Sequence, residues 1–260
     1  MPEQATVVVV PAATGRAHRV DRRFYISMAL LMILFNVVAF GPSIIDPSRR
    51  NAPLPFTPLV MAHAITSAAW LILFLTQATL VATGRTAVHR RVGIVGAVLT
   101  VMFIVVGYFT IIEAARRGFN LSGDGGLPAR PGAPPNPADV AILFNLMTFA
   151  ILAGVGLCYR HRPSVHKRLM LLAMLGGLTP TPVGHVIGHW PALQPWAGAI
   201  FPFSTLIFVS ASAIYDRVSQ GRIHPVSLWG TILIPASIPV FFGVIEPTVA
   251  WREFATWLIR

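Results

Sequence analysis

Two histidines near the middle of this chain have the spacing of a metal site. His185 and His189 lie four residues apart in the segment GGLTPTPVGHVIGHW, residues 176–190. In a helix this spacing places both imidazoles on one face, where they can bind one metal ion. His63 lies near the start of an earlier apolar segment, and we expect this start to lie on the same side of the membrane as the pair. His63, His185 and His189 are therefore our candidate metal ligands.

Two glycines and two prolines interrupt the segment just before this pair: Gly176, Gly177, Pro180 and Pro182. Proline removes a backbone donor, and irregular backbone at membrane depth is tolerated only inside protein or beside a water-filled cavity. We therefore expect a polar cavity here, with Glu113 and Asp139 as candidates to complete its wall. The alternatives stay open: His63 as a packing residue, His189 as an interfacial residue, and both carboxylates as solvated helix ends.

Two basic turns repeat each other and carry a second pair of histidines. RTAVHRRV at 85–92 and RPSVHKRL at 162–169 share the pattern R-x-x-V-H-[RK]-R followed by an apolar residue, with an offset of 77. Each copy joins an inbound helix to an outbound one, so the two hairpins would form a parallel repeat about an axis along the membrane normal. His89 and His166 could then face each other and bind a haem or a metal. Alternatively they are interfacial residues of turns that bind lipid phosphates.

The composition is that of an integral membrane protein. Of 260 residues 55% are hydrophobic and only 11% are charged, against about 25% charged in soluble domains. A spanning helix needs about 20 mostly apolar residues. Seven segments qualify, and we predict an all-α polytopic fold in which helices two to five form a pseudo-two-fold four-helix core. The predicted spans are 24–41, 58–83, 92–114, 139–159, 168–189, 199–215 and 226–245, between a flexible cytoplasmic tail (1–23) and an outer interfacial segment (246–260).

The basic residues predict the orientation and the surroundings. Thirteen of the 20 arginines and lysines lie on the side of the amino terminus and seven on the other, which places the amino terminus in the cytoplasm. Nineteen of the 20 are arginine, as is typical of a GC-rich bacterial genome, so we expect a bacterial inner membrane. Because the cations form short clusters between apolar runs, we expect the lipid bilayer and its anionic headgroups as partners, and no nucleic acid.

Several motifs resemble a family of bacterial predicted membrane proteins whose domain has no assigned function. They are H-A-x-x-x-x-x-x-W-x-x-L-F-x-x-Q over residues 63–77, V-A-T-G-R-T-A-V-H-R-R at 81–91, R-P-S-V-H-K-R-L-M-L-L-A at 162–173 and G-R-I-H-P-V-S-L-W-G at 221–230. This resemblance covers most of the chain and implies a seven-helix membrane domain, but it implies no activity.

Two looser likenesses suggest functions. Transmembrane di-haem cytochromes hold haems between histidines of a four-helix core, although the inner histidines here lie at turns. Seven-helix membrane zinc hydrolases share the H-x-x-x-H pattern, but they carry it on the last helix rather than the fifth. The sequence thus leaves four hypotheses: a metal- or haem-binding protein, which could be redox-linked; a small-solute or proton-linked transporter; a non-enzymatic accessory or assembly subunit; and a membrane zinc hydrolase.

Overall fold

The computed structural model describes residues 13–46, 56–118 and 134–260, which are almost entirely helical and contain no strand. The helices are α1 (Ala13–Ile45), α2 (Pro58–Ala82), α3 (Thr86–Arg117), η2 (Pro137–Ile142), α4 (Leu143–Cys158), α5 (Pro163–Leu172), the π-helical turn η3 (Ala173–Gly177), α6 (Pro180–His189), η4 (Pro191–Trp196), α7 (Ala197–Gln220), α8 (Pro225–Val240), the π-helical turn η5 (Phe241–Ile245) and α9 (Val249–Leu258). The predicted all-α polytopic membrane fold is confirmed.

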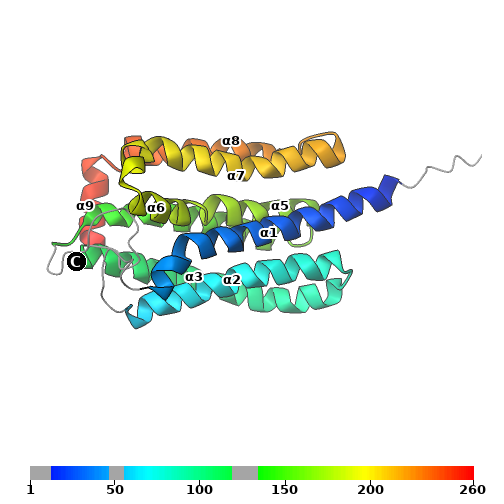
Figure 1. The fold of residues 1–260 in the computed structure, drawn as a ribbon, viewed down its shortest axis with the longest axis horizontal. Coiled ribbons are helices and arrows are strands. Elements are labelled where there is room, and N and C mark those ends of the chain that lie inside the picture. Colours follow the sequence, from blue (N-terminus) through cyan, green and yellow to red (C-terminus); the bar gives the residue numbers. More distant parts are fainter. Residues whose placement is uncertain (1–12, 47–55, 119–133) are drawn as a thin grey trace, which may run out of the picture.

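Seven helical stretches within the described residues are long and apolar enough to cross a membrane. They lie side by side along the long axis of the molecule (Figure 1). The fifth stretch combines α5, η3 and α6. The start of α1 and the turns α2–α3, α4–α5 and α7–α8 meet at one end, which we call the basic end; α9 lies across the other end, the α9 end. Residues 119–133, between α3 and η2, lie outside the described residues.

The fifth span is the centre of the bundle. Of its most apolar window 72% is buried within the protein, whereas the other six spans are 22–33% buried. Glycines allow its neighbours to approach: a methyl group at Gly177 would lie 2.6 Å from Phe149 Cβ in α4, and one at Gly230 in α8 would lie 2.4 Å from Leu172 Cδ1. Small residues at such contacts are the usual way in which membrane helices pack closely.

Helices two to five pack around one cluster of aromatic rings. The Trp70 ring of α2 lies 4.9 Å from that of Phe149 in α4, and Phe103 of α3 contacts Phe149 at the same distance. The Trp70 indole donates a hydrogen bond to Thr100 Oγ1 at 3.1 Å, so its polar atom is satisfied inside the bundle.

The last helix closes the α9 end. Ala255 and Ile259 are buried against α3 and η2, and the Trp251 ring lies 5.0 Å from that of Phe241. Arg116 donates to the carbonyl oxygens of Ile259 and Arg260 at 2.9 and 2.6 Å. The segment predicted to lie along the interface is thus a helix that is fixed to α3 at its carboxyl end.

The closeness of α4 and η3 can be tested with a matched pair of glycine variants. We expect Gly177→Ala to destabilise the protein by about 1–3 kcal/mol, since the added methyl group overpacks the contact with Phe149. Gly154→Ala, where nothing lies within 4 Å of the added atom, should instead be neutral or stabilising by up to about 1 kcal/mol. Thermal unfolding in detergent measures both, and equal shifts for the two variants would contradict this packing.

Candidate functional site

The structure places the histidines of the two repeated turns next to each other. His89 is the fourth residue of α3 and His166 the fourth of α5, and the two ring centroids are 6.4 Å apart. Their backbone amides bond to equivalent carbonyls, His89 to Arg85 at 3.0 Å and His166 to Arg162 at 2.9 Å. Residues related by a two-fold axis meet only if they lie close to it. The two turns therefore have the arrangement that a pseudo-two-fold repeat requires.

The two imidazoles have different hydrogen bonds. His166 Nδ1 donates to the Gly156 carbonyl oxygen at 2.7 Å. Because a carbonyl can only accept, Nδ1 carries the proton and Nε2 has the free lone pair in the neutral ring. His89 Nδ1 is buried without a hydrogen-bond partner among the described residues. Gln77 donates from Nε2 to the His89 carbonyl oxygen at 3.3 Å, while its own Oε1 is likewise buried and unbonded within that part of the chain.

These groups form what we call the four-helix polar cluster: Gln77 of α2, His89 of α3, the Gly156 carbonyl of α4 and His166 of α5. Each of the four helices contributes one group, near the basic end. Buried polar atoms without partners are uncommon in proteins and often mark a bound water or ion. Imidazole is a ligand for zinc, copper, iron and nickel.

The second histidine pair lies towards the α9 end, with His185 buried and His189 half-buried. His185 is 2% exposed, and its ring centroid is 4.3 Å from that of His189 and 4.6 Å from that of Phe40. Its Nε2 lies 3.3 Å from Ser43 Oγ, and His189 Nδ1 donates to the His185 carbonyl oxygen at 2.8 Å. The predicted pairing of His185 and His189 on one helical face is present.

His63 does not join this pair in a three-ligand site. Its ring stacks on Phe103 of α3 at 5.6 Å and lies beside Gly107. In residues 13–46, 56–118 and 134–260, no three side chains of histidine, cysteine, aspartate or glutamate come together closely enough to hold a metal ion. The two candidate carboxylates have other contacts: Glu113 pairs with Arg117, and Asp139 accepts from Asn136 at 3.1 Å.

The interruption of the fifth span differs from the cavity that we expected. The backbone forms a π-helical turn at Ala173–Gly177, and all five residues are buried. Gly177 touches Phe149, and a methyl group at Gly176 would lie 2.9 Å from Ile234 in α8. Close packing against two neighbouring helices therefore accounts for both glycines.

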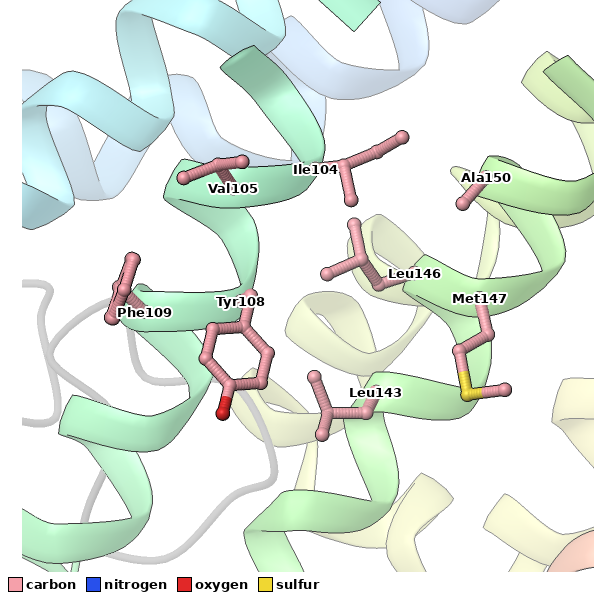
Figure 2. A pocket seen from close by; sticks show the side chains of 8 residues that line it. All are labelled: Ile104, Val105, Tyr108, Phe109, Leu143, Leu146, Met147 and Ala150. Atoms are coloured by element: carbon pink, nitrogen blue, oxygen red, sulfur yellow. The ribbon is translucent and has the colours of Figure 1, made fainter. Parts of the chain in front are cut away.

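An apolar groove of about 370 Å³ lies instead between α3 and α4, and no histidine lines it (Figure 2). Its walls include Val105 and Tyr108 from α3 and Leu143 and Met147 from α4. The side chains in Figure 2 are hydrocarbon apart from the Tyr108 hydroxyl and the Met147 sulfur. Such a lining suits an acyl chain or an apolar helix better than a polar substrate.

A buried ion pair at the basic end was not predicted from the sequence. Arg168, which we assigned to a cytoplasmic turn, is 1% exposed and donates from Nε to Asp216 Oδ2 and Oδ1 at 2.9 and 3.1 Å, and also from Nη2 to Oδ1. Its Nη1 donates to the Ser164 carbonyl oxygen at 2.7 Å, and the His224 amide donates to Asp216 Oδ2 at 3.2 Å. The available signal was Asp216 itself, since a carboxylate directly after an apolar run needs a partner.

Loss of this ion pair should cost far more than loss of an exposed one. Asp216→Ala leaves the Arg168 guanidinium buried and unpaired, so we expect a loss of about 3–5 kcal/mol. Glu113→Gln, which breaks the partly exposed pair with Arg117, should cost about 0–1 kcal/mol. Replacing Arg168 and Asp216 together by leucine should recover most of the stability. Thermal melting in detergent provides the comparison, and similar melting of Asp216→Ala and Glu113→Gln would refute it.

His224 should make the α7–α8 turn sensitive to acid. Burial lowers the pKa of its imidazole, and the Arg168 guanidinium lowers it further, against a smaller opposing effect of Asp216. The neutral Nδ1 accepts from the Val226 amide at 3.2 Å and so caps α8. Because the folded-state pKa is the lower one, this contribution to stability is present at neutral pH and is lost as the pH falls below about 6.5.

The cap can be tested with His224→Asn, which retains an N-cap acceptor but does not titrate. We expect the melting temperature of the parent protein to fall more steeply between about pH 7 and pH 5 than that of the variant. Identical slopes for the two proteins would show that His224 is not responsible.

Comparisons with protein-family models, with curated proteins and with solved structures found no match. The resemblance of the motifs to bacterial membrane proteins therefore stays a prediction. The case for a function depends on the two histidine pairs and on the elements that hold them.

Proposed function

We propose that this integral membrane protein binds one transition metal ion, or the iron of a haem, between His89 and His166. The observation that carries the proposal is that these two histidines, equivalent in the repeat and 77 residues apart, have ring centroids 6.4 Å apart. Two imidazoles that hold one metal from opposite sides, with bonds of about 2 Å, have ring centroids roughly 6 Å apart.

The hydrogen bonds of the cluster support this assignment. Metal-ligating histidines usually donate their other ring nitrogen to a carboxylate or a backbone carbonyl, which fixes the tautomer. His166 has this bond to Gly156 and keeps Nε2 for a ligand. Metal binding would also explain the buried His89 Nδ1, which lacks a partner among the described residues. A bound iron or copper would supply one-electron chemistry, and the chain would orient it and control its access to water.

The surface at this end suits the cytoplasmic face of a bacterial inner membrane. Apart from the paired Arg168, the arginines whose side chains are described at this end are exposed. They are Arg23, Arg85, Arg90, Arg91, Arg160, Arg162, Arg217 and Arg222. The carboxylate of Asp216, at the same end, is buried in its ion pair. Basic residues gather on the cytoplasmic side, where they contact anionic headgroups. His89 and His166, in the first turns of their helices, would lie just beneath that surface.

The experiment is optical and elemental analysis of the protein purified from membranes. We expect about one metal or haem per chain, and loss of most of it in His89→Ala and in His166→Ala. A haem would give a Soret band, and a metal ion would appear in the elemental analysis alone. His161→Ala is the matched control, because His161 lies exposed in the same α4–α5 turn.

Variants of the second histidine pair, His185 and His189, test the alternative site. If His185→Ala and His189→Ala abolish binding while His89→Ala and His166→Ala retain it, the site lies at the outer pair and the proposal is wrong. Protein that contains neither a Soret band nor a stoichiometric metal would refute metal and haem binding altogether.

A further inference from the structure

The two repeats differ in what covers them. In α5 and η3 of the fifth span, Arg168, Leu172 and Leu175 are 0–1% exposed, because α7 and α8 pack over that side. Asp216 of α7 pairs with Arg168, and Gly230 of α8 lies against Leu172. This side of the fifth span is therefore an interface between helices, with one ion pair at its basic end.

The equivalent side of α3 has no such cover within the described residues. With the offset of 77, Arg168, Leu172 and Leu175 correspond to Arg91, Val95 and Val98. Val95 is 61% and Val98 is 58% exposed, and Arg91 is exposed. At 100° per residue, Arg91, Val95, Val98, Met102 and Val105 form one straight stripe along the helix. We call this stripe the α3 face.

The α3 face continues into the groove of Figure 2. Val105 belongs to both, and Phe109 extends the stripe towards the α9 end. There the surface is concave, with α4 as its second wall. A ridge of side chains from another helix packs into a groove of this kind.

The charge at the basic end of the face defines the partner. Arg91 makes no ion pair or hydrogen bond with the rest of the described chain, whereas its equivalent Arg168 has Asp216. An arginine at the edge of an apolar interface needs an acceptor when a neighbouring helix displaces its water. The covering helix should therefore carry a carboxylate at the same level.

We propose that the α3 face binds a transmembrane helix of a partner protein, and that this helix carries an aspartate or glutamate near its basic-end terminus for Arg91. The partner would occupy on α3 the position that α7 occupies on α5. A second copy of this chain does not fit. Five carboxylates, Asp46, Glu113, Asp139, Glu246 and Glu253, lie at the α9 end. Asp21 lies near the start of α1 at the basic end, but it stands among Arg19, Arg22 and Arg23. A copy in the same orientation would therefore bring more cations than carboxylates to Arg91.

The test is photo-cross-linking in the membranes of the native host, with full-length protein carrying a photoreactive amino acid at Val98. The matched control has it at Ile207 of α7, which is 69% exposed at a similar distance from the basic end. We expect one protein adduct from Val98 and none from Ile207. Arg91→Gln should reduce the yield of this adduct at least about tenfold, because it removes one member of a charge pair that is buried in the complex. Because Arg91 is exposed and unpaired within the described chain, this variant should fold normally, and elution as a single species from a sizing column would confirm that.

Charge reversal decides whether the adduct is the proposed partner. The cross-linked peptide must be a transmembrane segment with a carboxylate near its basic end. Replacing the partner's carboxylate residue by arginine should abolish the adduct with the parent chain. Combining that partner variant with Arg91→Asp in this chain should restore the adduct. Adducts with lipid alone, an adduct between two copies of this chain, a partner segment without a carboxylate, or an undiminished yield with Arg91→Gln would each overturn the proposal.

Discussion

The pair of Arg168 and Asp216 fixes the central span of this protein. In a bilayer no water can solvate a buried charge, so each of these groups depends on the other and on hydrogen bonds for its remaining positions. The Ser164 carbonyl and the His224 amide supply those bonds. Residues two apart on a helix point in nearly opposite directions. Since Arg168 is held towards α7 and α8, His166 is turned away from them, towards α3 and His89.

Glycine contacts then set how closely the other helices approach this span. Lipid tails are as apolar as leucine, so the hydrophobic effect gives little reason for two helices to associate within a bilayer, and close van der Waals contact has to supply it. Gly177 lets the fifth span touch Phe149, and Gly230 lets α8 touch Leu172. The result is a tightly enclosed centre at the point where the glycines and prolines, considered alone, predicted a polar cavity.

Much of this arrangement could be predicted because it depends on local patterns. Hydropathy located all seven spans, and the repeated turns raised the facing of His89 and His166 as one of two alternatives. The ion pair could not be found in this way. Counting basic residues by loop treats Arg168 like any surface arginine, and its partner is 48 positions further along the chain. Hydropathy also could not show that Gly176 packs against α8. Glycine is expected both beside a cavity and at a close contact between helices, so its presence does not distinguish the two.

The departures from symmetry give the two histidines of the pair different surroundings. Near a pseudo-two-fold axis both halves of a repeat meet the same neighbours, and both supply histidine. One shell further out the halves differ: Gln77 corresponds to Gly154, and the Gly156 carbonyl binds only the ring of His166. One imidazole therefore has its tautomer fixed, whereas the other keeps its buried nitrogen unbonded within the described chain. In the proposed site, two rings of the same type would thus be inequivalent donors, one preorganised and one able to adjust.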